Sequence, residues 1–290
     1  MRYITNKGTT VPLILFLVFS ILLTCLFLIE DIREKAYIQK KSGSPTEGFG
    51  PGETKISPEI FTTAPKVEAQ IVIILDDVGW NPDIVSFVKK IPVPLTLAVL
   101  PDSPFGLKIA KQLSGKQNIE ILLHLPLEPD NVTSETLIAQ NFLSTTMDKE
   151  ELTNRLDDYF GKFGPYIVGV NNHMGSKFTR DQEKMEILLK EIKEKKLIFV
   201  DSLTTSKSVG YREAKKMQIK TAKRDIFLDN SSDPESIVKG LLLAGKIAKE
   251  KGSAIAIGHA KTVTMQVLEE KLPEMVKEGY NFDFATALAR

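Results

Sequence analysis

A buried strand that ends in two carboxylates constrains this chain more than any other feature. Residues 71–80 read IVIILDDVGW, in which five apolar residues lead directly into Asp76 and Asp77. The apolar run has no polar alternation, which is typical of a strand covered on both faces, as in parallel sheets. The two aspartates then stand at the carboxyl end of the strand, where α/β sheets and barrels collect their chemistry. Because adjacent anions repel each other, a positive charge is expected beside them, and a metal ion is the obvious candidate.

The alternation of strand and helix continues along residues 69–290. Amphipathic helices are expected over 147–160, over 181–195 and after Asp233, which is an N-cap followed by proline. About seven or eight such units in roughly 220 residues predict an α/β fold, namely a deformed (β/α)7-type barrel. A doubly wound open sheet is the alternative, although the Gly-x-Gly turn of dinucleotide-binding sheets is missing after the first strand. The strands are expected at 71–75, 95–100, 119–123, 167–171, 197–201, 219–222, 254–258 and 282–286.

The segment that precedes this domain has the pattern of a membrane anchor and a tether. Residues 11–29 are apolar and uncharged, long enough at about 1.5 Å per residue to cross a bilayer of roughly 30 Å. Residues 30–68 are rich in turn formers and are interpreted as a flexible linker. A cleaved signal peptide is the alternative, but no small-x-small cleavage site follows the apolar run. We therefore expect residues 1–10 to be a short cytoplasmic tail and the domain to be extracytoplasmic, periplasmic or at the cell surface.

Composition excludes several classes of function. The formal net charge of +1 gives no electrostatic case for a nucleic-acid partner. The single cysteine, Cys25, lies inside the apolar segment, so residues 69–290 contain neither a thiol nucleophile nor a cysteine zinc site. The Gly-x-Ser-x-Gly elbow of serine hydrolases and the phosphate-binding loop are both missing.

The three histidines of the chain all fall at the carboxyl ends of expected strands. His124 ends one strand, His173 follows another by two residues, and His259 ends a third, while Asp201 ends a fourth. A single histidine in such a place is more often a surface or core residue than a functional one. Carboxyl ends of parallel strands meet at one edge, however, so these side chains are expected to converge with the aspartate pair.

The residue types at this edge indicate metal-dependent hydrolysis. Two imidazoles and a carboxylate suit Zn²⁺ or another divalent transition ion, and three protein ligands leave a position open for water. A water on such an ion reaches a pKa near ~7 and becomes a nucleophile. The remaining carboxylate of the pair can take its proton, and His259 can give a proton to a leaving amine or alkoxide.

Six stretches of the chain resemble the divergent polysaccharide deacetylase family, a branch of the carbohydrate deacetylases related to chitin and peptidoglycan deacetylases. The resemblance covers about 69–290 and implies a deformed barrel with an Asp-His-His metal site. It matches Asp76 to the general base, Asp77 to a metal ligand, His124 to the first metal histidine and His259 to the acid histidine. The stretches are DD at 76–77, HLPLEP at 124–129, NNHMGS at 171–176, FVDS at 199–202, RDIFLDN at 224–230 and IGHA at 257–260.

The chain departs from its better-known relatives at the third ligand. Those relatives carry a second histidine four residues after the first, where this chain has Glu128. We expect His173 to be the third ligand, with Glu128 as the alternative. The Arg-x-Pro stretch of the relatives is also missing, and Arg224 and Asp225 are expected to take over part of its orienting role. The residues expected to support the site or bind substrate are Glu128, Asn172, Asp201, Arg224 and Asp225.

The expected function is therefore a hydrolase that removes acetyl groups, from an amide or an ester, from an acetylated cell-envelope polysaccharide. The alternative is a catalytically weak glycan-binding or envelope-assembly protein that retains the barrel.

Overall fold

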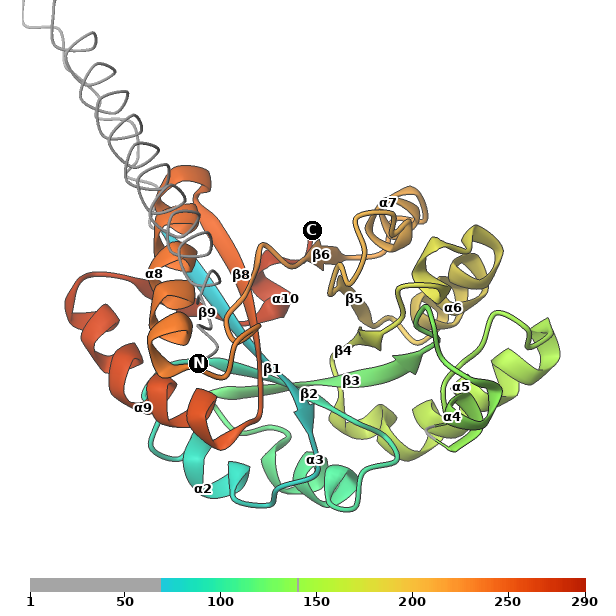
Figure 1. Cartoon of the computed structure of the whole chain (residues 1–290), viewed down its shortest axis with the longest axis horizontal. Coiled ribbons are helices and arrows are strands. Elements are labelled where there is room, and N and C mark those ends of the chain that lie inside the picture. The colour runs from blue at the N-terminus through green and yellow to red at the C-terminus, as the bar shows by residue number, and fades with distance from the viewer. Residues whose placement is uncertain (1–68, 140) are drawn as a thin grey trace, which may run out of the picture. The chain divides into compact units, whose positions relative to one another are not determined.

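The computed structural model describes residues 69–139 and 141–290, which form one curled sheet surrounded by helices (Figure 1). The sheet has nine strands, and every pairing between them is parallel. The strands are β1 (Gln70–Val78), β2 (Leu95–Val99), β3 (Ile119–Leu127), β4 (Gly169–Met174), β5 (Ile198–Asp201), β6 (Thr221–Lys223), β7 (Ile226–Phe227), β8 (Ser253–His259) and β9 (Asn281–Asp283).

The strand order is that of a barrel with one opening. The order β6-β5-β4-β3-β2-β1-β8-β7 follows the chain around a circle, and β9 pairs with β1 beside it. Within the described residues β6 and β7 do not pair, so the sheet curls without closing. The expected parallel α/β sheet is confirmed. The barrel is an open one, and β7 joins it as a strand that the sequence pattern did not show.

Both faces of β1 are buried, which explains why its sequence lacks polar alternation. Ile71, Ile73 and Leu75 belong to the large core between the sheet and the outer helices, whereas Val72 and Ile74 face the smaller core inside the curl.

The helices are α2 (Ile84–Val88), α3 (Gly106–Leu113), α4 (Ser134–Ala139), α5 (Lys149–Phe163), α6 (Gln182–Glu194), α7 (Gly210–Lys216), α8 (Pro234–Lys251), α9 (Thr262–Lys277) and α10 (Ala285–Leu288), with short 3₁₀ turns η1 (Gly164–Tyr166) and η2 (Phe178–Arg180).

The C-terminal helix α10 fills the inside of the curl, close to the amino ends of the strands (Figure 1). The Thr286 hydroxyl and amide donate to the buried carboxylate of Glu120 near the start of β3, at 2.6 and 3.1 Å. Arg290 exchanges two backbone hydrogen bonds with Thr221 of β6. The strand expected at 282–286 is thus a shorter strand followed by this helix. Because α10 occupies the amino ends, the carboxyl ends of the strands are left for a site.

The expected anchor over 11–29, its tail over 1–10 and the linker over 30–68 lie outside the described residues. Among residues 69–139 and 141–290, no helix has both the length and the apolar character needed to span a bilayer.

Candidate metal centre

A bulge at the end of β1 separates the two adjacent aspartates. The pairing between β1 and β2 shifts register between Leu75 and Val78, and Asp77 has a φ of 60°, in the left-handed region that few residues other than glycine adopt. Bulges of this kind redirect side chains next to functional sites. As a result Asp76 is buried and stands in register with His259 of β8, whereas Asp77 is only half-buried.

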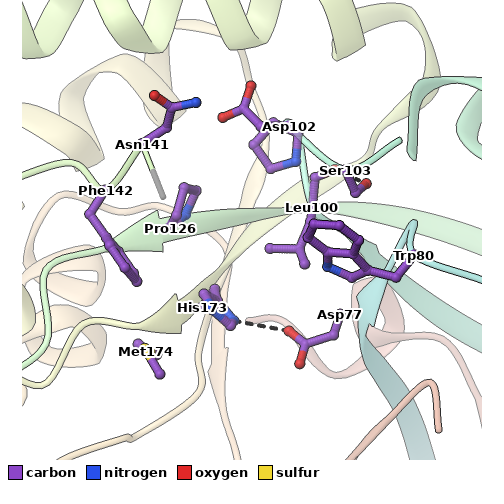
Figure 2. A pocket seen from close by; sticks show the side chains of 11 residues that line it. Asp77, Trp80, Leu100, Asp102, Ser103, Pro126, Asn141, Phe142, His173 and Met174 are labelled. Atoms are coloured by element: carbon purple, nitrogen blue, oxygen red, sulfur yellow. Dashed lines mark hydrogen bonds and ion pairs between the residues drawn. The ribbon is translucent and has the colours of Figure 1, made fainter. Parts of the chain in front are cut away.

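Three ligand atoms from three strands meet beside this bulge. Asp77 Oδ1 lies 3.3 Å from His124 Nε2 and 2.9 Å from His173 Nδ1, and the two ring nitrogens are 3.2 Å apart. Ligands at about 2.0 Å from a tetrahedral zinc ion are separated by about 3.3 Å, so these spacings match one face of such a site. Figure 2 shows the Asp77 and His173 side chains directed toward each other.

The charge and the hydrogen bonding of the Asp77 carboxylate are also those expected of a metal ligand. Its Oδ1 is buried and has no hydrogen bond of acceptable geometry among the described residues. Burial alone would raise the pKa of Asp77, but His124 and His173 hold that pKa well below its usual range. This anionic oxygen and the two imidazole nitrogens therefore face one point. Within the described part of the chain, this is the group of side chains that can hold an ion.

Asn171 of β4 fixes which nitrogen of His124 faces the cluster. Its amide nitrogen donates to Asp76 Oδ1 at 2.8 Å, so its oxygen accepts from His124 Nδ1 at 2.9 Å. The proton of His124 then sits on Nδ1, and the lone pair of Nε2 is left for an ion. Sequence reasoning missed Asn171 as a site residue, although it opens the NNHMGS stretch at the same strand end as His173.

We predict that Asn171→Ala weakens zinc binding by about 10- to 100-fold, as expected for a residue that orients a metal ligand. Competition with a chromophoric chelator measures the affinity. Asn118→Ala is the matched control, because the Asn118 amide bonds only the Ile91 carbonyl among the described residues. An unchanged affinity in Asn171→Ala would mean that His124 needs no such partner.

Two groups that can transfer protons lie next to the cluster. The Asp76 Oδ2 atom is 3.6 Å from His124 Nε2, and burial raises the pKa of Asp76 against the opposing effect of His124. The His259 Nδ1 atom is 2.8 Å from Asp229 Oδ1. The hydrogen bond to Asp229 raises the pKa of His259, although burial opposes it.

Asp229 was also missed by sequence reasoning, and it holds His259 firmly. Its second oxygen accepts from the His259 amide at 2.9 Å and from the Thr264 hydroxyl at 2.8 Å. Because His259 Nδ1 is committed to Asp229, its Nε2 is free to carry a transferable proton. The residue lies in the RDIFLDN stretch, but nothing in that stretch distinguishes it from its neighbours.

The Glu128 carboxylate is bound by hydrogen-bond donors of two loops and does not face the ligand cluster. Its Oε2 accepts from the Ser144 hydroxyl and from the Thr145 amide and hydroxyl, at 3.0, 2.7 and 2.7 Å. Its Oε1 accepts from Lys177 at 2.6 Å. Burial alone would raise the pKa of Glu128, but Lys177 and these donors lower it. Glu128 thus joins the loop after α4 to the loop after β4 and does not belong to the ligand cluster.

We predict that Glu128→Ala lowers the free energy of unfolding by about 1–3 kcal/mol, because it leaves several donors without their acceptor. Urea titration measures this change. Glu194→Ala is the control, since its exposed pair with Lys190 at 3.8 Å contributes at most about 1 kcal/mol. Loss of zinc binding in Glu128→Ala without loss of stability would make Glu128 a ligand instead.

The other expected supporting residues shape the loops around the centre. Asn172 accepts from the Ser202 amide at 2.9 Å and donates to the Met174 carbonyl at 2.7 Å, which ties the end of β4 to the end of β5. Asp201 is fully buried. It accepts from the Leu203 amide, the Ser208 hydroxyl and the Tyr211 amide, so it orders the loop after β5.

Arg224 and Asp225 were both expected to help orient the site, but their side chains bind different parts of the structure. Arg224 donates to the carbonyls of Ser202 and Leu203 and lies 3.7 Å over the ring of Phe227, which stacks on His259. Asp225 accepts from the Ile255 amide near the start of β8 and pairs with Lys251. Arg224 therefore supports the His259 side of the centre, and Asp225 lies away from it.

A cavity of about 470 Å³ opens beside Asp77 and His173 (Figure 2). This volume lies in the usual range for small-ligand sites. Its further walls come from the loop after β1, the loop after β2 and the loop before α5, with Trp80, Leu100, Asp102, Phe142 and Met174 among the lining residues.

A sequence model described as divergent polysaccharide deacetylase matches residues 73–289. The chain belongs to this family. The match thus runs from within β1 to the end of α10, and the resemblance seen in the six sequence stretches is confirmed.

Two relatives of the chain are described as uncharacterized proteins. The chain is 32% identical over 208 residues to the uncharacterized protein YibQ of Escherichia coli, a match that covers 72% of this chain and 64% of that protein, less than two thirds of its length. It is 31% identical over 224 residues to an uncharacterized protein of Haemophilus influenzae, covering 76% and 78% of the two chains. The crystal structure of the uncharacterized protein ATU2773 from Agrobacterium tumefaciens shares the fold, with a TM-score of 0.69, 21% identity and coverage of 76% and 89%.

Proposed function

We propose that this protein is a metal-dependent hydrolase that removes acetyl groups from a glycan. The observation that carries the proposal is the meeting of Asp77, His124 and His173 around one point. Family membership supports a carbohydrate deacetylase as the class of enzyme. The donor set of one carboxylate and two imidazoles suits Zn²⁺ best among common divalent ions.

When bound, such an ion supplies a Lewis acid that polarises the acetyl carbonyl and makes water acidic enough to lose its proton near neutral pH. Asp77, His124 and His173 are the residues that would hold it. The hydrogen bond from Asn171 keeps the lone pair of His124 Nε2 directed toward Asp77 and His173. Because the Glu128 carboxylate is bound to Lys177, His173 is the third ligand in this proposal.

The two proton-transfer roles follow from the hydrogen bonds of Asp76 and His259. Asp76 Oδ1 is held by Asn171, so Oδ2 is the oxygen that accepts the proton of the attacking water. Burial raises the pKa of Asp76, which makes it a stronger base than an exposed aspartate. His259, oriented by Asp229, then donates its Nε2 proton to the departing nitrogen or oxygen as the acyl bond breaks. Acetate and the deacetylated sugar are the products.

A panel of N-acetylated and O-acetylated glycans tests the proposal. The purified protein should release acetate from at least one member, lose this activity on chelation and regain it with zinc. Binding of glycans that survives chelation, without any acetate release across the panel, would favour the glycan-binding alternative. Bound metal without activity on any glycan would call for another substrate.

We further propose that the substrate is a cell-envelope polymer outside the cytoplasmic membrane. This rests on the uncharged segment 11–29 and the turn-rich segment 30–68, which have the pattern of an anchor and a tether. Protease added to intact spheroplasts should digest the domain. Digestion only after lysis would place the domain on the cytoplasmic side.

A further inference from the structure

The cavity beside the candidate metal centre has an exposed aromatic ring at its rim. Trp80, two residues after β1, lines the cavity and is 64% exposed. It is also the only tryptophan of the chain. Indole rings offer a large flat face that attracts apolar and cationic groups. Trp80 therefore offers an accessible aromatic face at the rim of the cavity.

A carboxylate in the same cavity has a fixed orientation. Asp102 Oδ2 accepts from the Tyr159 hydroxyl at 2.7 Å, and Tyr159 is buried on α5. Burial, with Asp102 beside it, raises the pKa of Tyr159, so the phenol keeps its proton and donates throughout the physiological range. Asp102 Oδ1 makes no hydrogen bond with the described residues, which leaves it available as an acceptor.

The acidic groups in the wall of the cavity stand on two sides, and Arg155 lies behind one of them, where it donates to the Asn141 carbonyl at 3.2 Å. Asp77 and Asp102 line the cavity, and none of the described lining residues is lysine or arginine. A divalent cation at Asp77 would more than offset the charge of that carboxylate, so Asp102 is the anionic group that remains in the cavity wall. An anionic ligand group near Asp102 would be repelled, whereas a hydroxyl or an ammonium group would be attracted. In the view of Figure 2, Asp102 and Asn141 lie on the side of the cavity opposite Asp77 and His173.

We propose that this cavity is a sugar subsite that selects neutral or amino sugars against acidic ones. A pyranose ring stacks on Trp80, and its hydroxyl or ammonium groups donate to Asp102, which Tyr159 positions. The proposal rests on the proposed function for the identity of the ligand as a sugar. Binding in this cavity can nevertheless be measured without turnover.

Trp80 fluorescence reports directly on the cavity because no other tryptophan contributes. The probes are three tetramers, of N-acetylglucosamine, of glucosamine and of galacturonate, titrated in the presence of chelator so that a sugar carboxylate cannot bind a metal. The first two should change the emission saturably, and the galacturonate tetramer should bind at least about tenfold more weakly, a difference of about 1.4 kcal/mol. Equal binding of the acidic tetramer, or no change in emission with any tetramer, would overturn the proposal.

Variants separate the roles within the subsite. Asp102→Asn should weaken binding of the glucosamine tetramer by about tenfold and reduce the discrimination against galacturonate severalfold, while the Asp77 carboxylate retains the remainder. Tyr159→Phe should raise KM for an accepted glycan severalfold with kcat nearly unchanged, which is the signature of lost ground-state positioning. Leu242→Ala, which shortens an exposed apolar side chain on α8, is the control and should change neither quantity.

The outcomes distinguish this proposal from the hydrolase itself. If no glycan releases acetate but the tetramers still titrate Trp80 and Asp102→Asn reduces the discrimination between them, the subsite stands and the hydrolase fails. If acetate is released while Trp80→Ala and Asp102→Asn leave KM unchanged, the subsite fails and the hydrolase stands.

Discussion

Asp77→Asn is expected to lose zinc and to lower kcat/KM for acetate release by at least about 10³-fold. Asparagine tolerates the left-handed backbone of position 77 and has nearly the same shape, so the bulge at the end of β1 should persist. What disappears is the anionic oxygen that faces His124 and His173 at 3.3 and 2.9 Å. Loss of the Lewis acid removes several kcal/mol of transition-state stabilisation, and each 1.4 kcal/mol is tenfold in rate.

The measurement combines zinc content per chain with the rate of acetate release. His124→Ala should give the same two losses, although it also opens a gap in a buried position. Asp157→Asn is the matched control, because that exposed carboxylate pairs only with Lys195 among the described residues. Full zinc content in Asp77→Asn, at wild-type affinity, would remove Asp77 from the ligand set.

His259→Gln is expected to lower kcat by about 10²- to 10⁴-fold while zinc content stays at the wild-type level. His259 belongs to β8 and to the Asp229 contact, not to the ligand cluster. Its loss should therefore affect proton donation to the leaving group and spare the ion. A variant that loses zinc and activity together would instead make His259 a ligand.

Asp229→Asn tests the proton-donor role of His259 through the pH dependence of activity. The Asp229 hydrogen bond raises the pKa of His259, so the protonated acid persists to higher pH in the wild type. Activity falls as pH rises through that pKa, because the acid form is lost. In Asp229→Asn this fall should move to lower pH, measured as kcat/KM across the pH range. If the fall of kcat/KM at high pH stayed in place or moved to higher pH, the proton-donor role of His259 would be contradicted.

Much of the fold was predictable because it depends on local patterns. The unbroken apolar run of β1 marked a strand buried on both faces, and the parallel arrangement placed the ends of β1, β3, β4 and β8 at one edge. The opening of the sheet was not predictable. It depends on whether β6 and β7, separated by Arg224 and Asp225 alone, pair with each other, and a two-residue strand leaves no periodic signal.

The sequence predicted which residue types converge at the site. It did not predict which of them is the third metal ligand or which ones orient the others. Glu128 could not be separated from His173 by spacing, because its partners Ser144, Thr145 and Lys177 reach it only through tertiary structure. Asn171 and Asp229 were missed for a related reason. They act through His124 and His259, and a residue that orients another carries no pattern of its own.

Anomalous diffraction from zinc-soaked crystals tests the central claim most directly. We predict a single strong peak in the domain, within about 2.0–2.2 Å of Asp77 Oδ1, His124 Nε2 and His173 Nδ1. A peak at Glu128, or no peak between the three side chains at saturating zinc, would contradict the account.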